Sequence, residues 1–201
     1  MSAELGAESW DDLSVVDPVR MHPNITDAEA LAVFQRKLPG AVAEMREVHH
    51  PFWWAPLRVR TRGLLRRESH GPGQEMNVFV NAVTGRAMIA DSTPVGTVEA
   101  GEAWSTILGE HGGQSRLPSR SEAARTARAL ARAKVVKTVK LGMGIEISTA
   151  DGHGLRGVLK PNWLVTGANS KHSATILVDG LDSSHYIVRV EKLDRNAAAL
   201  R

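Results

Sequence analysis

The segment Leu57–Arg62 reads LRVRTR, and its alternation decides how the N-terminal half of the chain should fold. Leu57, Val59 and Thr61 occupy every second position, and an arginine follows each of them. Because successive side chains of a strand point to opposite faces, this pattern predicts a half-buried strand whose arginines share the exposed face. The strand signal begins after His49-His50-Pro51.

Helical signals precede this strand. Thr26 and Glu29 have the spacing of a capping box, which predicts a helix that begins at Asp27 and ends before Pro39-Gly40. A second helical stretch is expected to continue as far as Val48.

A hairpin and a short helix are expected after the strand. Apolar residues alternate from Met76 to Ala82, and the turn Asn81–Gly85 leads to a returning strand at Arg86–Ala90. Helical spacing then predicts a helix around Trp104, with Gly109 as its C-terminal cap.

The C-terminal half switches from helix to strand. Ser119 and Glu122 repeat the capping-box spacing, and an alanine- and arginine-rich run follows, which predicts a basic helix that ends near Lys134. From Val139 onward, apolar residues alternate in several short runs separated by Asp-Gly turns, and Pro161-Asn162-Trp163 is expected to interrupt one of them. Several short antiparallel strands avoid exposed edges by closing into a barrel.

These signals predict an α+β protein with an N-terminal helix plus β-hairpin domain, a basic connecting helix and a C-terminal small antiparallel, SH3-like β-barrel. The expected boundaries are a disordered acidic tail at 1–20, the N-terminal domain at 21–110, a linker at 111–119, the helix at 120–136, the barrel at 137–194 and a tail at 195–201.

Composition excludes several classes of protein. The 201 residues contain no cysteine, which rules out disulfide scaffolds, thiolate zinc sites and thiol nucleophiles. The chain shows neither a run of apolar residues long enough to span a membrane nor the pattern of a signal peptide, so we expect a soluble, cytoplasmic protein.

Charge is arranged in blocks. Met1–Val48 holds nine acids and four bases, whereas His49–Ala90 holds six arginines and two acids, and Ser119–Leu141 holds seven bases and one acid. Arginines arrayed on one strand face and one helix face can bind phosphates or a protein partner, or they can pair with the chain's own acidic blocks. The candidate residues for partner or phosphate binding are Arg58, Arg60, Arg62, Arg66, Arg67, Arg125, Arg128 and Arg132.

The cluster Phe52, Trp53 and Trp54 contributes three of the nine aromatic residues in the chain. In a chain with few aromatic residues, such a cluster is most often part of the core. It is also a candidate hot spot for a protein partner, and next to the arginine strand it could stack on bases.

Metal and catalytic motifs are missing from the sequence. His49 and His50 are adjacent and diverge on either a strand or a helix, and neither HExxH nor GxSxG occurs. We expect no metal site, no cofactor and no catalytic residue. An enzyme that uses Asp179, Asp182 and His185, should they converge on a pocket, is a third hypothesis.

The leading hypothesis is a non-enzymatic binding or scaffold protein. It would engage a macromolecular partner, or assemble with itself, through β-surfaces, the aromatic patch and the arginine faces. The alternative is a nucleic-acid-binding or regulatory protein whose two sets of arginines contact phosphates. No membrane partner is expected.

Overall fold

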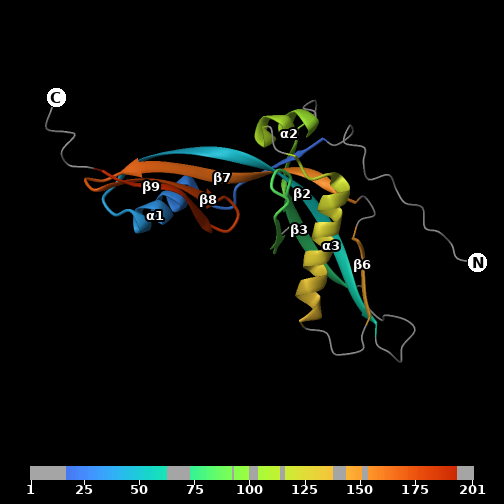
Figure 1. The fold of residues 1–201 in the computed structure, drawn as a ribbon. Coiled ribbons are helices and arrows are strands. Elements are labelled where there is room, and N and C mark those ends of the chain that lie inside the picture. The colour runs from blue at the N-terminus through green and yellow to red at the C-terminus, as the bar shows by residue number, and fades with distance from the viewer. Residues whose placement is uncertain are drawn as a thin grey trace, which may run out of the picture. The chain divides into compact units, whose positions relative to one another are not determined.

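A computed structural model describes residues 17–62, 73–91, 93–99, 104–113, 116–137, 144–150 and 154–193. These residues form a mixed α+β fold in which helices pack on a large, mostly antiparallel, open sheet (Figure 1). Contacts divide the chain into two compact units: unit 1 comprises Met1–Val19 and Pro51–Leu159, and unit 2 comprises Arg20–His50 and Lys160–Arg201. Strands β2 (Val42–Arg62) and β7 (Arg156–Ala168) each contribute to both units.

The sheet is ordered β4-β3-β2-β7-β1-β5, with β6 beside β2, β8 beside β7 and β9 beside β8. The short strands are β1 (Val19–Met21) and β5 (Gly96–Val98). The predicted hairpin is present: β3 (Gln74–Asn81) pairs antiparallel with β4 (Ala87–Ala90), and Gly85 adopts a φ of 71° in the turn.

The core of unit 1 lies between the sheet and two helices. Helix α2 (Trp104–Gly112) continues past Gly109, the expected cap. Helix α3 (Arg120–Val136) contacts β3, β4 and β6, so it packs inside unit 1. Figure 1 shows it beside β3 and β6. Its buried stripe consists of Ala123, Ala127, Ala131 and Val135. The helix runs past Lys134 to Val136, the end of the expected 120–136 segment, because Val135 extends this stripe by one more turn.

The capping box predicted for α3 is confirmed. Ser119 Oγ accepts a hydrogen bond from the Glu122 amide at 3.2 Å, and the Glu122 carboxylate accepts one from the Ser119 amide at 2.8 Å. Arg116 also donates to this carboxylate at 2.8 Å. The hydrogen bonds from Arg116 and from the Ser119 amide lower the pKa of Glu122 from 4.5 to about 2.

This lowered pKa predicts how Glu122 contributes to stability. The carboxylate favours the folded state above pH 4.5, and the contribution is lost as the pH falls through about 2. We expect Glu122→Gln to lower the midpoint of thermal unfolding at pH 7, and the gap to the wild type to close between pH 4.5 and 2. Circular dichroism melts across this range would check it, with Glu110→Gln on α2 as the control. A gap that does not depend on pH would contradict the assignment.

Unit 2 has one helix packed on strands. Helix α1 (Asp27–Lys37) starts at the predicted Thr26–Glu29 capping box and lies against β8 (His172–Asp179), which pairs with β7 and with β9 (His185–Lys192). The buried residues of this core are Ala30, Val33, Phe34, Leu38, Val165, Ala174, Ile176 and Val178.

Two local predictions are wrong. Residues 42–48 belong to β2 instead of a helix, because Ala43 and Met45 alternate toward the core under α1. Pro161 does not interrupt β7, because the register with β8 begins at Asn162, just beyond the proline, and its carbonyl still accepts from the Gly180 amide at 3.1 Å.

The predicted C-terminal barrel is also wrong, since the sheet is open. Closure would require β6 (Gly144–Thr149) to join the strands of unit 2. Instead β6 pairs with β2, and Ile145 and Ile147 pack on the core of unit 1. The 21-residue strand β2 is long enough to supply partners for both units, and this removes the need for closure.

Candidate functional site

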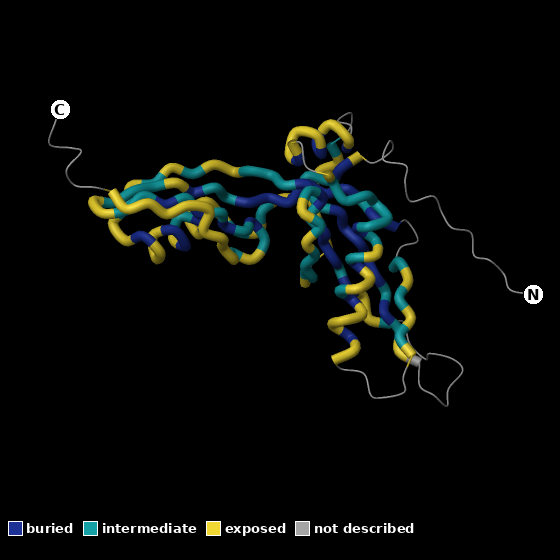
Figure 2. The backbone as a smooth tube through the Cα atoms, viewed as in Figure 1, coloured by how far each residue is buried: buried dark blue, intermediate teal, exposed yellow. Residues whose placement is uncertain are grey.

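Strand β9 is the outer strand of unit 2, and it is exposed on both faces. All eight of its residues are exposed, and Figure 2 shows the strand in yellow. The apolar residues include Tyr186 (69% exposed), Val188 (53%) and Val190 (56%). Alternation in this part of the sequence predicted a strand of a closed barrel, whereas every residue of β9 is exposed in the structure. Such an edge offers both apolar side chains and backbone groups to another strand.

The opposite edge of unit 2 has a different character. Strands β3 and β6 pair only with residues 52–62 of β2, so residues 42–50 form an edge in the described part of the chain. Exposed Glu44, Arg46 and Glu47 lie along it. Charged side chains are a common protection of edges, and each edge carries three of them. The edges differ in exposed apolar residues, because β9 has Tyr186, Ile187, Val188 and Val190, whereas residues 42–50 have Val42.

The aromatic cluster lies on β2 within unit 1. Trp53 is fully buried and meets Trp104 edge-on, with ring centroids 5.2 Å apart. Trp54 points to the other face, is 7% exposed, and donates to Asn77 Oδ1 at 2.9 Å. Phe52 is half-buried against Phe79, at 6.4 Å. Most of the aromatic surface therefore contributes to packing inside unit 1.

The strand arginines have acidic neighbours. Arg58 and Arg60 share the face opposite Leu57 and Val59, as predicted. Arg58 forms an ion pair at 2.8 Å with Glu75, its cross-strand neighbour on β3, and Glu146 lies opposite Arg60 on β6. These carboxylates come from the adjacent strands, whereas we considered pairing with the distant acidic blocks. The Arg62 side chain and all of Arg66 and Arg67 lie outside the described residues.

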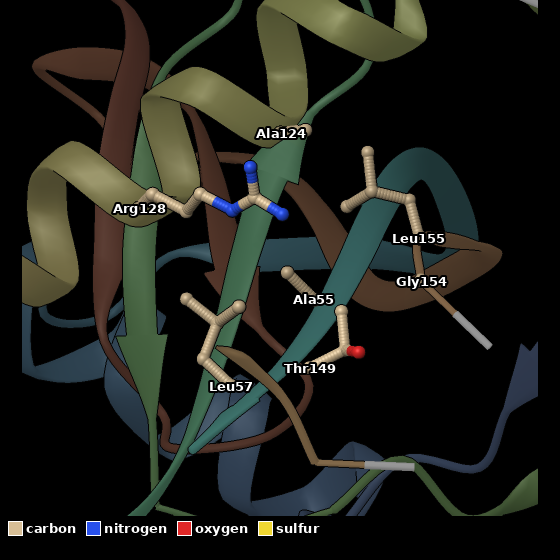
Figure 3. Close-up of a pocket in the computed structure, with 7 residues that line it drawn as sticks. All are labelled: Ala55, Leu57, Ala124, Arg128, Thr149, Gly154 and Leu155. Atoms are coloured by element: carbon tan, nitrogen blue, oxygen red, sulfur yellow. The ribbon is translucent and has the colours of Figure 1, made fainter. Parts of the chain in front are cut away.

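The helix arginines Arg125, Arg128 and Arg132 are exposed on α3. Figure 3 shows Arg128 reaching beside Leu57, Ala55 and Leu155, at a cavity between α3 and the sheet. Its volume of about 10 Å³ admits a single water molecule and excludes a small-molecule ligand.

A buried polar network in unit 2 was missed by the sequence reasoning. Lys160 is 2% exposed and forms an ion pair with Asp179, while its ammonium lies 3.4 Å from Asn162 Oδ1. The Asn162 side-chain amide donates to His50 Nδ1 at 2.9 Å and to the Lys160 carbonyl at 3.2 Å. Lysine is rarely buried unless it is paired. The sequence did contain a signal for this network. Lys160 and Asn162 alternate on either side of Pro161, the residue that we expected to interrupt the strand.

The Asp179–His185 region forms a turn. Asp179 Oδ1 accepts from the Leu181 amide at 2.9 Å, and Asp182 Oδ1 accepts from the Ser184 amide at 2.8 Å. These bonds are typical of aspartates that stabilise turns. The described residues contain no cluster of three or more groups able to hold a metal ion.

Comparison of the chain with family models, with curated proteins and with solved structures gave no significant match. The helices that the structure describes are too short or too polar to span a bilayer.

Proposed function

We propose that this chain is a non-enzymatic binding protein that pairs the exposed edge of β9 with another polypeptide strand, either in a second copy or in a different protein. The observation that carries the proposal is an edge strand that is exposed along its whole length and includes four exposed apolar residues, Tyr186, Ile187, Val188 and Val190. Added strands gain affinity from main-chain hydrogen bonds and specificity from alternate side chains.

The other candidate surfaces support this function less. Trp53 and Trp54 pack inside unit 1, and Arg58 pairs with Glu75, so each already has an intramolecular role. A nucleic-acid interface would depend mainly on the exposed α3 arginines, Arg125, Arg128 and Arg132.

The proposal predicts strand-mediated association. Light scattering should show a mass above 21.8 kDa that rises with concentration, or else a fluorescent peptide of residues 185–193 should bind the protein with increased anisotropy. Val188→Lys should reduce either signal at least tenfold, because a charge on an edge strand opposes pairing. Circular dichroism should stay unchanged, because Val188 is exposed.

The matched control is Val42→Lys, which places the same charge at an 85% exposed valine on the opposite edge of unit 2. It should leave the association intact. The proposed function is contradicted if the wild-type protein stays at the monomer mass at concentrations up to about 100 µM and binds no peptide.

A further inference from the structure

The outward-facing backbone groups of β9 can be identified from its pairing with β8. The Leu193 amide donates to the Lys171 carbonyl at 2.8 Å, and Lys192 lies opposite His172. Hydrogen-bonded residues alternate along an antiparallel strand, so the amides and carbonyls of Val190 and Lys192 point away from β8. The edge therefore offers its hydrogen-bonding groups at alternate residues centred near Val190.

The side chains of β9 complement themselves around Val190. If two antiparallel copies of β9 meet with Val190 opposite Val190, then Arg189 of each copy lies opposite Glu191 of the other. In one chain Arg189 and Glu191 already form an ion pair along the same face, so the two copies would form a group of four alternating charges.

Other registers are less favourable. Centring the pair on Arg189, Glu191 or Lys192 places like charges directly opposite, which destabilises a strand pair. Centring it on Val188 places the irregularity of β9 in the middle of the ladder, because the register with β8 shifts between Thr175 and Ile176. Among the registers centred on residues 188–192, the one centred on Val190 combines opposite charges with a regular central run.

We propose that the partner of β9 is a second copy of this chain, paired antiparallel about a two-fold axis at Val190. This inference rests on the proposed function, whose partner it specifies. In a two-fold interface both copies contribute the same β9 edge, so no β9 edge is left exposed and assembly stops at a dimer. Pairing of β9 with the β2 edge of another copy would instead continue without closing.

Cysteine cross-linking tests the register directly, because the chain contains no cysteine. Directly opposite residues of an antiparallel pair have Cα atoms about 4.5 to 5.5 Å apart, within the range of a disulfide. Val190→Cys should give a disulfide-linked dimer on a non-reducing gel under mild oxidation. Val188→Cys is the matched control: in this register its two copies are offset by four residues, roughly 13 Å, and should not link.

A charge swap tests the same pairing without cysteine. Arg189→Glu should weaken the dimer about tenfold by analytical ultracentrifugation, because both cross-strand pairs become repulsive. Adding Glu191→Arg to that variant restores the opposite charges and should bring the dissociation constant back to within about threefold of the wild type.

The outcomes separate this inference from the proposed function. A wild type that associates, or binds the 185–193 peptide, while Val190→Cys fails to link and the double swap fails to restore the dimer, overturns the register but keeps strand pairing at β9. Linking through Val188→Cys in preference to Val190→Cys also overturns it. A mass that grows beyond a dimer and falls with Val42→Lys shows head-to-tail pairing and contradicts the two-fold dimer. A wild type that neither associates nor binds the peptide overturns both.

Discussion

Replacing Lys160 with methionine should reduce the free energy of unfolding by about 3 to 5 kcal/mol. The ammonium is almost fully buried, and its removal leaves the Asp179 carboxylate, whose side chain is 14% exposed, without its cationic partner. The loss comes mainly from stranding a buried charge, since an intact buried pair contributes little net stability. Urea denaturation followed by circular dichroism would measure the change.

Two further variants identify the cause. Lys160→Met combined with Asp179→Asn should recover part of the loss, because the stranded charge is gone and the asparagine oxygen can still accept from the Leu181 amide. Lys171→Met, at an exposed lysine in the same unit, should stay within about 0.5 kcal/mol of the wild type. If Lys160→Met is no more destabilising than Lys171→Met, the ion pair has no structural importance.

Truncating Trp53 to alanine should cost about 3 to 5 kcal/mol in unit 1. The indole is fully buried against Trp104, and its removal leaves a cavity between the sheet and α2. Trp53→Phe should cost less, since it keeps an aromatic ring and the buried indole N–H makes no hydrogen bond within the described residues. Chemical denaturation followed by circular dichroism would rank the three proteins.

Tyr186→Ala is the control for the tryptophan series, because Tyr186 is the exposed aromatic of β9. It should leave the stability of the monomer within about 0.5 kcal/mol of the wild type. A Trp53→Ala protein as stable as the wild type would show that the Trp53–Trp104 contact contributes nothing to unit 1. If a destabilised Trp53→Ala protein no longer associates, the cause is unfolding of unit 1. Such a result would not identify Trp53 as an interface residue.

The candidate surface could be predicted only in part. Alternation at Tyr186, Val188 and Val190 identifies a strand, but the same pattern occurs in half-buried and in fully exposed strands. Exposure of β9 depends on tertiary packing: α1 contacts β8, and all eight residues of the neighbouring β9 stay exposed. The Lys160–Asp179 pair joins residues nineteen positions apart. The alternation of Lys160 and Asn162 indicates a shared face of a strand, but it does not identify Asp179 as the partner.

Local interactions are what the sequence by itself determined. The capping boxes at Thr26 and Ser119 set where two helices begin, and Asn81–Gly85 set the β3–β4 turn, because each depends on contacts between residues a few positions apart. The tertiary structure decided that β6 joins β2, that the sheet stays open and that β9 lies at its edge. Those outcomes depend on competition among distant strands for the same backbone groups and the same cores, which no short stretch of sequence encodes.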